Sequence, residues 1–309
     1  MEIWHAQMTT TPLSAPSLAS VSARELARQE ALSVGRWVPA PNAPSPEVFW
    51  AHIRAQSAAM GAAEPLMAGV CSMSIGMHAT LASSLAFLLA TKLSCANFLG
   101  PQLQELFGQA YASDPSLLEA CAADLQVAVE RDPACESEAQ CLLFFKGFHA
   151  LQVHRVAHWM WTRGRKSLAL ALQSRVADVF AVDIHPAARV GWGVMVDHAT
   201  GVVVGETAVV GDNVSLLHQT TLGGSGTGRG SRHPLIGNGV VLGAGVSILG
   251  PVIVGAHSKV GAGSVVLTDL PGSVVAVGVP ARIVRRLGDA ERPSASMDQC
   301  YDYIEDYTI

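Results

Sequence analysis

The residues best suited to chemistry lie in the stretch "VDHATG" (196–201), where His198 follows an aspartate and precedes a run of valine and glycine. A neutral imidazole takes up a proton near pH 7, so this histidine could act as a general base on an alcohol or amine. In a coil of three hexads Gly201 would stack above Asp183, about one strand spacing, roughly 4.8 Å, along the axis. We therefore predict that Asp183 reaches and orients His198. The alternative, from spacing alone, is a turn histidine that bonds to backbone.

A second candidate pair is Arg232 and His233, at the returning end of the glycine-rich stretch "GGSGTGRGSRHPL". An arginine beside a histidine suits bidentate capture of a carboxylate, and the alternative is a solvated loop tip. The pairs Gly243-Ala244 and Gly261-Ala262 are separated by three hexads and therefore stack in successive coils. They leave a row without bulky side chains, which is either a groove for a long ligand or tight turn packing.

A repeat of six residues must position these side chains. Small apolar residues recur at every sixth position from Ile184 to Thr220 and again from Ile236 to Val266, and 20 of the 29 glycines fall between 184 and 286. This period is typical of a hexapeptide parallel β-helix, in which stacked coils share one apolar core. The step from Thr220 to Ile236 is not a multiple of six, so the glycine-rich stretch should leave the coil as a loop.

The chain before the repeat has a helical pattern. Ser45 is a plausible N-cap for "PEVFWAHIRAQ", and "SLLEACAADLQVAVER" spaces its apolar residues at three and four before Pro133. Two more helical runs follow, "QCLLFFKGFHALQVHRVAHWMWTRG" and "RKSLALALQSRVADVFAV". The most apolar run, 80–93, is shorter than the roughly 20 residues of a membrane span and predicts a buried helix. We expect a mobile N-terminal extension (1–45), a helical domain (46–182), the β-helix (183–286) and a C-terminal tail (287–309).

Composition narrows the class of protein. The chain has 309 residues, a formal charge of −5 and a pI near 6.1, so nucleic acid and membrane are not expected partners. The six cysteines form no CxxC pair. We predict that they are reduced thiols in the cytoplasm. Residues 6–23 are hydroxyl-rich and acid-free, so a plastid or mitochondrial address is the alternative to a disordered extension.

Several motifs together resemble serine O-acetyltransferases, over about 46–286. They are "ERDPAC", "KGFHALQVHRVAHWMW", "VDIHPAARVGWGVMVDHATGVVVGETAVVGDNVSLLHQTTLGG", "SRHP", "LGAGVSILG" and "GVPARIVRR". The hexad period is generic to many acyltransferases, whereas "VDIHPAA", "VDHATG" and "RHP" in this order are specific. The resemblance implies an α+β chain with an all-helical domain and a left-handed parallel β-helix. It also implies trimers, often paired into hexamers, with active sites between neighbouring chains.

The same resemblance implies a reaction and its residues. Acetyl-CoA would be the co-substrate, L-serine the acceptor, and no metal would take part, with O-acetylserine made for cysteine synthesis. His198 would be the general base and Asp183 its orienting partner. The residues that would hold the amino acid are Asp132, Asp197, Arg232 and His233. The residues that would line the acetyl-CoA groove are Gly224, Ala244 and Ala262.

The acidic and aromatic end "MDQCYDYIEDYTI" has two interpretations. Composition favours a disordered solubilising tail. The resemblance implies that Ile309, with its free carboxylate, enters the active site of a partner enzyme, O-acetylserine sulfhydrylase.

Three classes of function stay open from the residues alone. The first is an acyltransferase, whose acceptor could instead be a sugar or homoserine. The second is a metal enzyme resembling γ-class carbonic anhydrase, in which His198 and His233 would need a third imidazole; Asn238, just beyond the loop, weakens that case. The third is a chiefly regulatory subunit that acts through Ile309.

Overall fold

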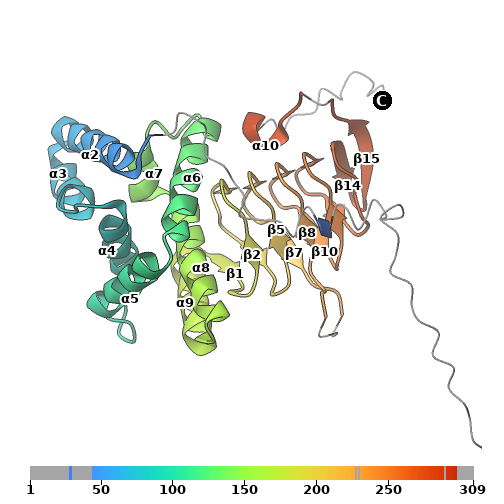
Figure 1. Ribbon diagram of the computed structural model, residues 1–309. Coiled ribbons are helices and arrows are strands. Elements are labelled where there is room, and N and C mark those ends of the chain that lie inside the picture. The colour runs from blue at the N-terminus through green and yellow to red at the C-terminus, as the bar shows by residue number, and fades with distance from the viewer. Residues whose placement is uncertain (1–27, 30–43, 227, 229, 289, 298–309) are drawn as a thin grey trace, which may run out of the picture.

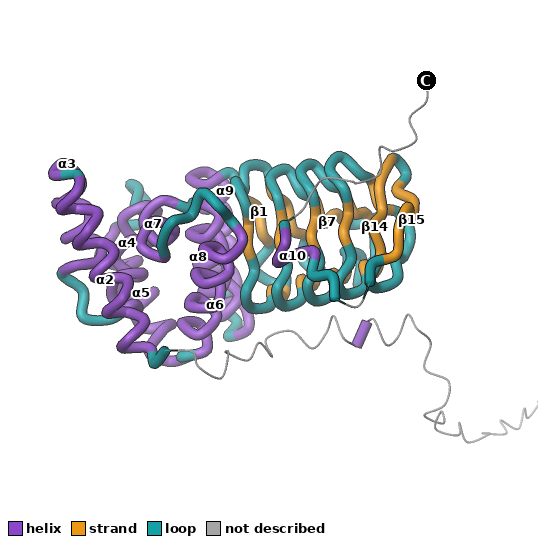
Figure 2. Tube along the Cα trace, turned by 90° about the horizontal axis from the view of Figure 1, so that it is seen from above, coloured by secondary structure: helices purple, strands orange, loops and turns teal. Residues whose placement is uncertain are grey.

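The structure is a computed structural model that describes residues 28–29, 44–226, 228, 230–288 and 290–297. Helices form one end of the molecule, and a solenoid of short strands forms the other (Figures 1 and 2). Almost all of the predicted extension 1–45 lies outside the described residues, as does Ile309. Within the described part of the chain, no helix is both long and apolar enough to cross a membrane.

The helical end contains the elements that the pattern predicted. Ser45 caps the first of them, since its hydroxyl accepts from the Val48 N–H at 3.4 Å, and the apolar run 80–93 is a buried helix. The helices are α2 (Pro46–Ala63), α3 (Pro65–Cys71), the π-helix η1 (Ser72–Gly76), α4 (Leu81–Leu93), α5 (Gly100–Ser113), α6 (Ser116–Arg131), α7 (Glu138–Phe144), α8 (Lys146–Thr162) and α9 (Lys166–Phe180).

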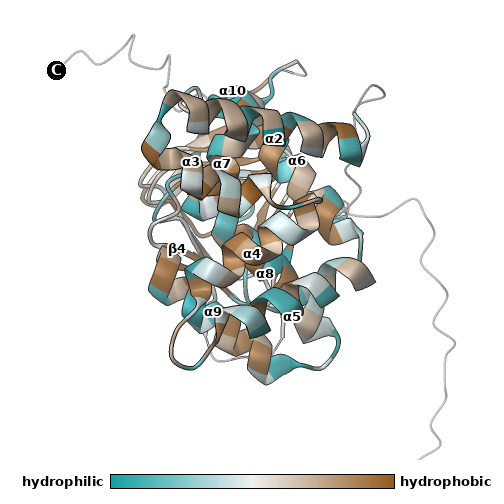
Figure 3. Cartoon of the chain, turned by 90° about the vertical axis from the view of Figure 1, so that its left-hand side faces the viewer, coloured by the Kyte–Doolittle hydropathy of each residue, from teal (hydrophilic) through white to brown (hydrophobic). Residues whose placement is uncertain are grey.

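One predicted helical run is divided in the structure. The stretch 140–164 forms the end of α7 and the whole of α8, because Phe145 has an extended backbone (φ −82°, ψ 104°). The break redirects the chain so that the first residues of α8 meet the solenoid. Residues of α8 from Gly147 to Ala157 are all buried, and Figure 3 shows the helical end, where apolar and polar segments alternate along the helices. The helices and the solenoid share one apolar core.

The solenoid has three faces of parallel strands, as the hexad period predicted. The first sheet has the order β1-β4-β7-β10-β13, the second β11-β8-β5-β2 and the third β15-β14-β12-β9-β6-β3. This architecture is consistent with the predicted left-handed β-helix. The strands are β1 (Val182–Ile184), β2 (Arg189–Val190), β3 (Met195–Val196), β4 (Val202–Val204), β5 (Val209–Val210), β6 (Ser215–Leu216), β7 (Thr221–Gly223), β8 (Leu235–Ile236), β9 (Val241–Leu242), β10 (Ser247–Leu249), β11 (Ile253–Val254), β12 (Lys259–Val260), β13 (Val265–Val266), β14 (Val274–Gly278) and β15 (Ala281–Arg286).

The strands are joined at three edges of the solenoid, which we name by the turns they contain. The histidine corner comprises 197–201, 217–220, 243–246 and 261–264. The loop corner comprises 185–188, 205–208, the described residues of 224–234 (224–226, 228 and 230–234) and 250–252. The helix corner comprises 191–194, 211–214, 237–240 and 255–258.

The first coil is longer than the three hexads that the period predicts. Asp183 pairs with Val203 in the next coil, whereas Ser247 pairs with Val265 further along, and only the second of these separations equals three hexads. The extra pair of residues lies in the turn that contains His198. The hexad positions that face the solenoid core therefore continue from Val196 to Val204 and not to Val202. Val202 and Val204 are nevertheless both buried.

The glycine-rich stretch leaves the coil, as predicted. Val209 pairs with Leu235, a separation that exceeds three hexads by the length of the protruding loop. At the far end β14 and β15 pair antiparallel and close the solenoid. The chain then returns along the solenoid to α10 (Pro293–Ser296), which contacts α6 (Figure 1).

Candidate active site

The turn at the histidine corner holds His198 away from the coil. His198 and Ala199 have φ values of 56° and 60°, in the left-handed region that side chains other than glycine rarely adopt. Residues held there cost of order 1–3 kcal/mol each and cluster at functional sites. The Ala199 side chain is buried, while that of His198 is 71% exposed. The turn therefore presents an imidazole to solvent on a strained, fixed backbone.

The first residues of α8 contact this turn and support it. Lys146 Nζ donates a hydrogen bond to the Thr200 hydroxyl. A Cβ on Gly147 would lie 1.9 Å from the Val196 carbonyl oxygen and 3.1 Å from the Ala199 Cβ. Only glycine lets α8 approach the turn so closely. The "KGF" motif thus has a direct role in placing His198.

A carboxylate and a second imidazole lie beside His198, and a second carboxylate acts on the first. Its Nε2 lies 3.5 Å from Asp197 Oδ2, and its ring centroid lies 5.6 Å from that of His218. Burial raises the pKa of the Asp197 carboxyl; His198 opposes this, and the Asp132 carboxylate adds to it. Because paired carboxylates repel one another, this corner favours a cationic ligand group such as an ammonium.

Asp183 does not occupy the place that stacking by three hexads predicted. The Gly201 N–H donates to the Ala181 carbonyl at 2.8 Å, so Gly201 stacks on Ala181 and not on Asp183. Asp183 is exposed on β1, and its Oδ1 accepts from Gln173 Nε2 at 2.6 Å. Among the contacts between described residues, none joins Asp183 to His198. The role of Asp183 as orienting partner stays a prediction.

Arg232 and His233 lie at the loop corner, beside the turn 205–208. Arg232 Nη2 donates to Glu206 Oε2 at 2.5 Å, and this bond is the main cause of the lowered pKa of the Glu206 carboxyl. Glu206 thus forms an ion pair with Arg232 at this corner. The backbone N–H groups of Arg232 and His233 both donate to the Thr207 hydroxyl, which holds the end of the loop against the coil.

His233 is oriented for donation. Its ring packs on Gly205, where an added Cβ would lie 2.0 Å from the imidazole. Its Nδ1 accepts from the Thr207 N–H at 3.1 Å, so the proton of the neutral ring belongs on Nε2. Burial, together with Arg232, lowers the pKa of His233 and keeps the ring neutral. An Nε2–H beside an arginine suits a carboxylate.

One chain does not bring all the predicted residues together. Three hexads to a coil give one hexad to each face, or up to about 20 Å between corners. Asp197 and His198 lie at the histidine corner and Asp132, at the end of α6, acts electrostatically on Asp197, whereas Arg232 and His233 lie at the loop corner. The predicted groove residues divide in the same way, because Ala244 and Ala262 follow β9 and β12 at the histidine corner while Gly224 lies beside His233.

The residues that sequence reasoning missed are Lys146, Gly147, Thr207 and His218. His218 lies in the next coil at the position that corresponds to His198. The true length of the first coil would therefore have shown that the two histidines are neighbours in successive coils. Among the described residues, no group of three or more His, Cys, Asp or Glu side chains is arranged to hold a metal ion.

A helical domain joined to hexapeptide coils, with a histidine displayed on a corner turn, defines the class of β-helix acyltransferases. The family described as "Serine acetyltransferase, N-terminal" matches residues 49–153, and "Bacterial transferase hexapeptide (six repeats)" matches 233–268. The chain belongs to the serine acetyltransferase family.

Relatives and solved structures agree with this placement. A serine acetyltransferase of Salmonella typhimurium is 46% identical over 258 residues, which cover 84% of this chain and 94% of the relative. A probable serine acetyltransferase of Oryza sativa is 51% identical over 263 residues, covering 84% and 86%. A solved serine acetyltransferase in complex with cysteine has a TM-score of 0.80 at 45% identity, covering 82% of this chain and 98% of that one. Soybean serine acetyltransferase complexed with serine has a TM-score of 0.76 at 54% identity, covering 79% and 100%.

Proposed function

We propose that the chain transfers the acetyl group of acetyl-CoA to the hydroxyl of L-serine, giving O-acetyl-L-serine and CoA. The observation that carries this proposal is the exposed His198 on its strained turn, beside the carboxylate of Asp197, which the Asp132 carboxylate in turn influences. An imidazole next to an ammonium site can deprotonate a hydroxyl only a few bonds from that ammonium. The soybean relative solved with serine supports the choice of acceptor.

In the proposed mechanism no covalent enzyme intermediate forms. His198 takes the proton of the serine hydroxyl as that oxygen attacks the thioester carbonyl carbon. The new C–O bond forms, the C–S bond breaks, and the imidazolium returns the proton to the CoA sulfur. Arg232 or backbone N–H groups stabilise the developing oxyanion. The same proposal makes Asp183 the orienting partner of His198. It also makes Gly224, Ala244 and Ala262 the lining of the acetyl-CoA groove.

We place the complete site between two chains of a trimer. A bound serine would need its ammonium at Asp132 and Asp197 and its carboxylate at Arg232 and His233. Those two groups lie about one face, up to roughly 20 Å, apart in one chain, which is too far for one small amino acid. The histidine corner of one chain with the loop corner of its neighbour would bring them together.

Mixed trimers test this arrangement. His198→Ala and Arg232→Ala chains are each expected to be inactive alone. After random reassembly at equal amounts, about a quarter of the sites should combine an intact histidine corner with an intact loop corner, so about a quarter of the wild-type rate should return. A site built within one chain would give no recovery.

The acceptor is tested by CoA release from acetyl-CoA with L-serine, L-homoserine or a galactoside. We expect L-serine to give the highest kcat/KM by at least about tenfold, because the ammonium and carboxylate must both be held. A faster reaction with a galactoside would overturn the proposed acceptor. Zinc content measured on the same sample tests the alternative hypothesis that the protein is a metal enzyme.

Two further parts of the proposal concern the cellular setting. Ile309 and the other residues from 298 onward lie outside the described residues; we propose that this end of the tail binds O-acetylserine sulfhydrylase. Deleting the last residues should abolish that binding and spare acetyl transfer. The chain would work in the cytoplasm, with a plastid or mitochondrion as the alternative that residues 6–23 suggest.

A further inference from the structure

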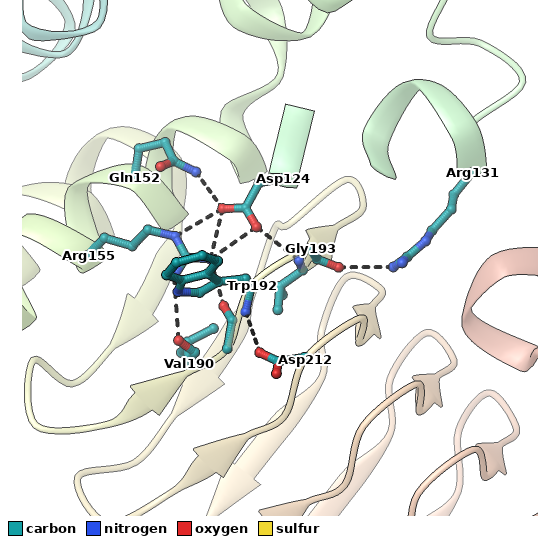
Figure 4. A network of polar contacts seen from close by, with 10 residues as sticks. Asp124, Arg131, Gln152, Arg155, Val190, Trp192, Gly193 and Asp212 are labelled. Atoms are coloured by element: carbon teal, nitrogen blue, oxygen red, sulfur yellow. Dashed lines mark hydrogen bonds and ion pairs between the residues drawn. The ribbon is translucent and has the colours of Figure 1, made fainter. Parts of the chain in front are cut away.

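The end of α6 carries Asp132, and two side chains earlier in this helix fasten it to the solenoid. Asp124 and Arg131 are separated by two helical turns and therefore lie on one face of the helix. Both reach the helix corner of the first coil, where Asp124 accepts from the Val194 N–H and Arg131 donates to the Gly193 carbonyl (Figure 4). The Asp132 carboxylate itself accepts from the Ala134 N–H at 2.8 Å, so these two attachments hold the helix end that carries this local turn.

The first attachment is a buried ion pair. Asp124 Oδ1 accepts from the Val194 N–H at 2.9 Å, and the same carboxylate accepts from Arg155 Nε at 2.9 Å. Arg155 Nη2 in turn donates to the Gly191 carbonyl at 2.7 Å. The backbone on both sides of the corner is thus held by one charged pair from α6 and α8.

The second attachment is Arg131, directly before Asp132. Its Nη1 donates to the Gly193 carbonyl at 3.2 Å and to the Ser215 hydroxyl at 3.0 Å, and its Nη2 donates to Asn213 Oδ1 at 3.2 Å. These acceptors belong to the first and second coils. Arg131 therefore joins the last turn of α6 to two successive coils of the solenoid.

Burial of the charged Arg131 side chain costs more free energy than a purely structural contact requires. The side chain is 7% exposed, and burial lowers its pKa to about 10, so it stays charged at neutral pH. No carboxylate of a described residue forms a salt bridge with it, and its Nε is buried without a partner. Its hydrogen bonds go to neutral acceptors, although the Glu130 and Asp124 carboxylates favour its charged form; a buried charge without a direct ion pair is usually less stable than apolar packing. Its directional hydrogen bonds, however, fix geometry.

The same cluster holds the start of the C-terminal segment. Ser215 Oγ donates to the Ser294 carbonyl of α10 at 3.2 Å, and Ser215 and Ser294 are both buried. The Ser215 hydroxyl thus connects Arg131 to the segment that continues towards the C-terminus. This connection places the base of that segment beside the helix end that carries Asp132.

We propose that Arg131 is a positioning residue of the amino-acid site, which fixes Asp132 opposite Asp197, and that Ser215 extends this clamp to Ser294. The inference rests on the proposed role of Asp132 in holding the serine ammonium. The His198 turn is supported separately by Lys146 and Gly147. Loss of Arg131 should therefore weaken serine binding much more than it slows the chemical step.

The test compares Arg131→Gln, Arg131→Lys and a matched control, Arg175→Gln. Arg175 also ties two segments through carbonyl groups, those of Leu93 and Ser94, but in the helical domain. We expect Arg131→Gln to raise the KM for L-serine at least about tenfold, while kcat and the KM for acetyl-CoA stay within about threefold. Arg131→Lys should be intermediate, and Arg175→Gln should lower Tm without changing the KM for serine.

Two further variants separate the possible failures. Asp132→Asn should raise the KM for serine; if it does not, the proposed role of Asp132 and this inference both fail. If Asp132→Asn raises it but Arg131→Gln has no more effect than Arg175→Gln, only the inference is overturned. Should Arg131→Gln not fold, Ser215→Ala decides: a rise of about two- to fivefold in the KM for serine supports the clamp, and an unchanged KM contradicts it.

Discussion

Replacing Gly147 with alanine should displace the proposed general base without touching it. The new Cβ would lie 1.9 Å from the Val196 carbonyl oxygen, where an ordinary contact is 3.4–4 Å. Since both partners are backbone, α8 and the turn must separate by about 1 to 1.5 Å. A misplacement of about 1 Å at a catalytic group can cost roughly a hundredfold in rate, and overpacking costs about 1–3 kcal/mol of stability. We therefore expect kcat for CoA release to fall about a hundredfold in a folded protein.

The matched control is Gly108→Ala in α5. An added Cβ there has no neighbouring atom within 4 Å, so the substitution should raise helix stability by up to about 1 kcal/mol and leave kcat unchanged. Tm and kcat measured on both variants separate loss of folding from loss of geometry. A Gly147→Ala protein with wild-type kcat would refute the argument that this contact places His198.

Three other predictions concern substrate affinity and pH. Thr207→Val removes the hydroxyl that supports the Arg232 and His233 backbone, so the KM for serine should rise about three- to tenfold with kcat nearly unchanged; an unchanged KM contradicts the described role of Thr207. Ala244→Leu fills the proposed groove and should raise the KM for acetyl-CoA at least about tenfold while sparing that for serine, and equal effects on both would argue against the groove. Burial lowers the pKa of His149 to about 3, so between pH 6.5 and 3 the unfolded chain binds a proton that the folded chain does not, and stability falls as the pH drops through that window. His149→Leu should reduce the loss of unfolding free energy between pH 7 and pH 5 by about 2 kcal/mol in urea titrations; an equal loss in both proteins would show that His149 is not responsible.

The architecture was predictable because a hexad period constrains every residue of a coil. Small apolar residues six apart fix three faces and a shared core, and the break before Ile236 revealed the loop. The cap of Ser45 and the buried helix 80–93 followed from equally local chemistry. The four-part division of the chain stays a prediction, since large parts of its two end segments lie outside the described residues.

The geometry around His198 was less predictable because it depends on a local exception. An extra pair of residues in the left-handed turn lengthens the first coil without changing the apolar pattern, since both Val202 and Val204 are buried. Stacking by three hexads therefore placed Gly201 above Asp183, when its partner is Ala181. Contacts between distant segments, such as Gly147 with the turn at 196–199, leave no periodic signal at all.

The central claim is that His198 is the general base for acetyl transfer to L-serine. The most direct test is kcat for serine-dependent CoA release by wild type and by His198→Ala, with the KM for serine measured on each. We predict that kcat falls by at least about a hundredfold while the KM changes only a few-fold, because the ammonium and carboxylate contacts are made by other residues. A variant that retains the wild-type kcat would contradict the account.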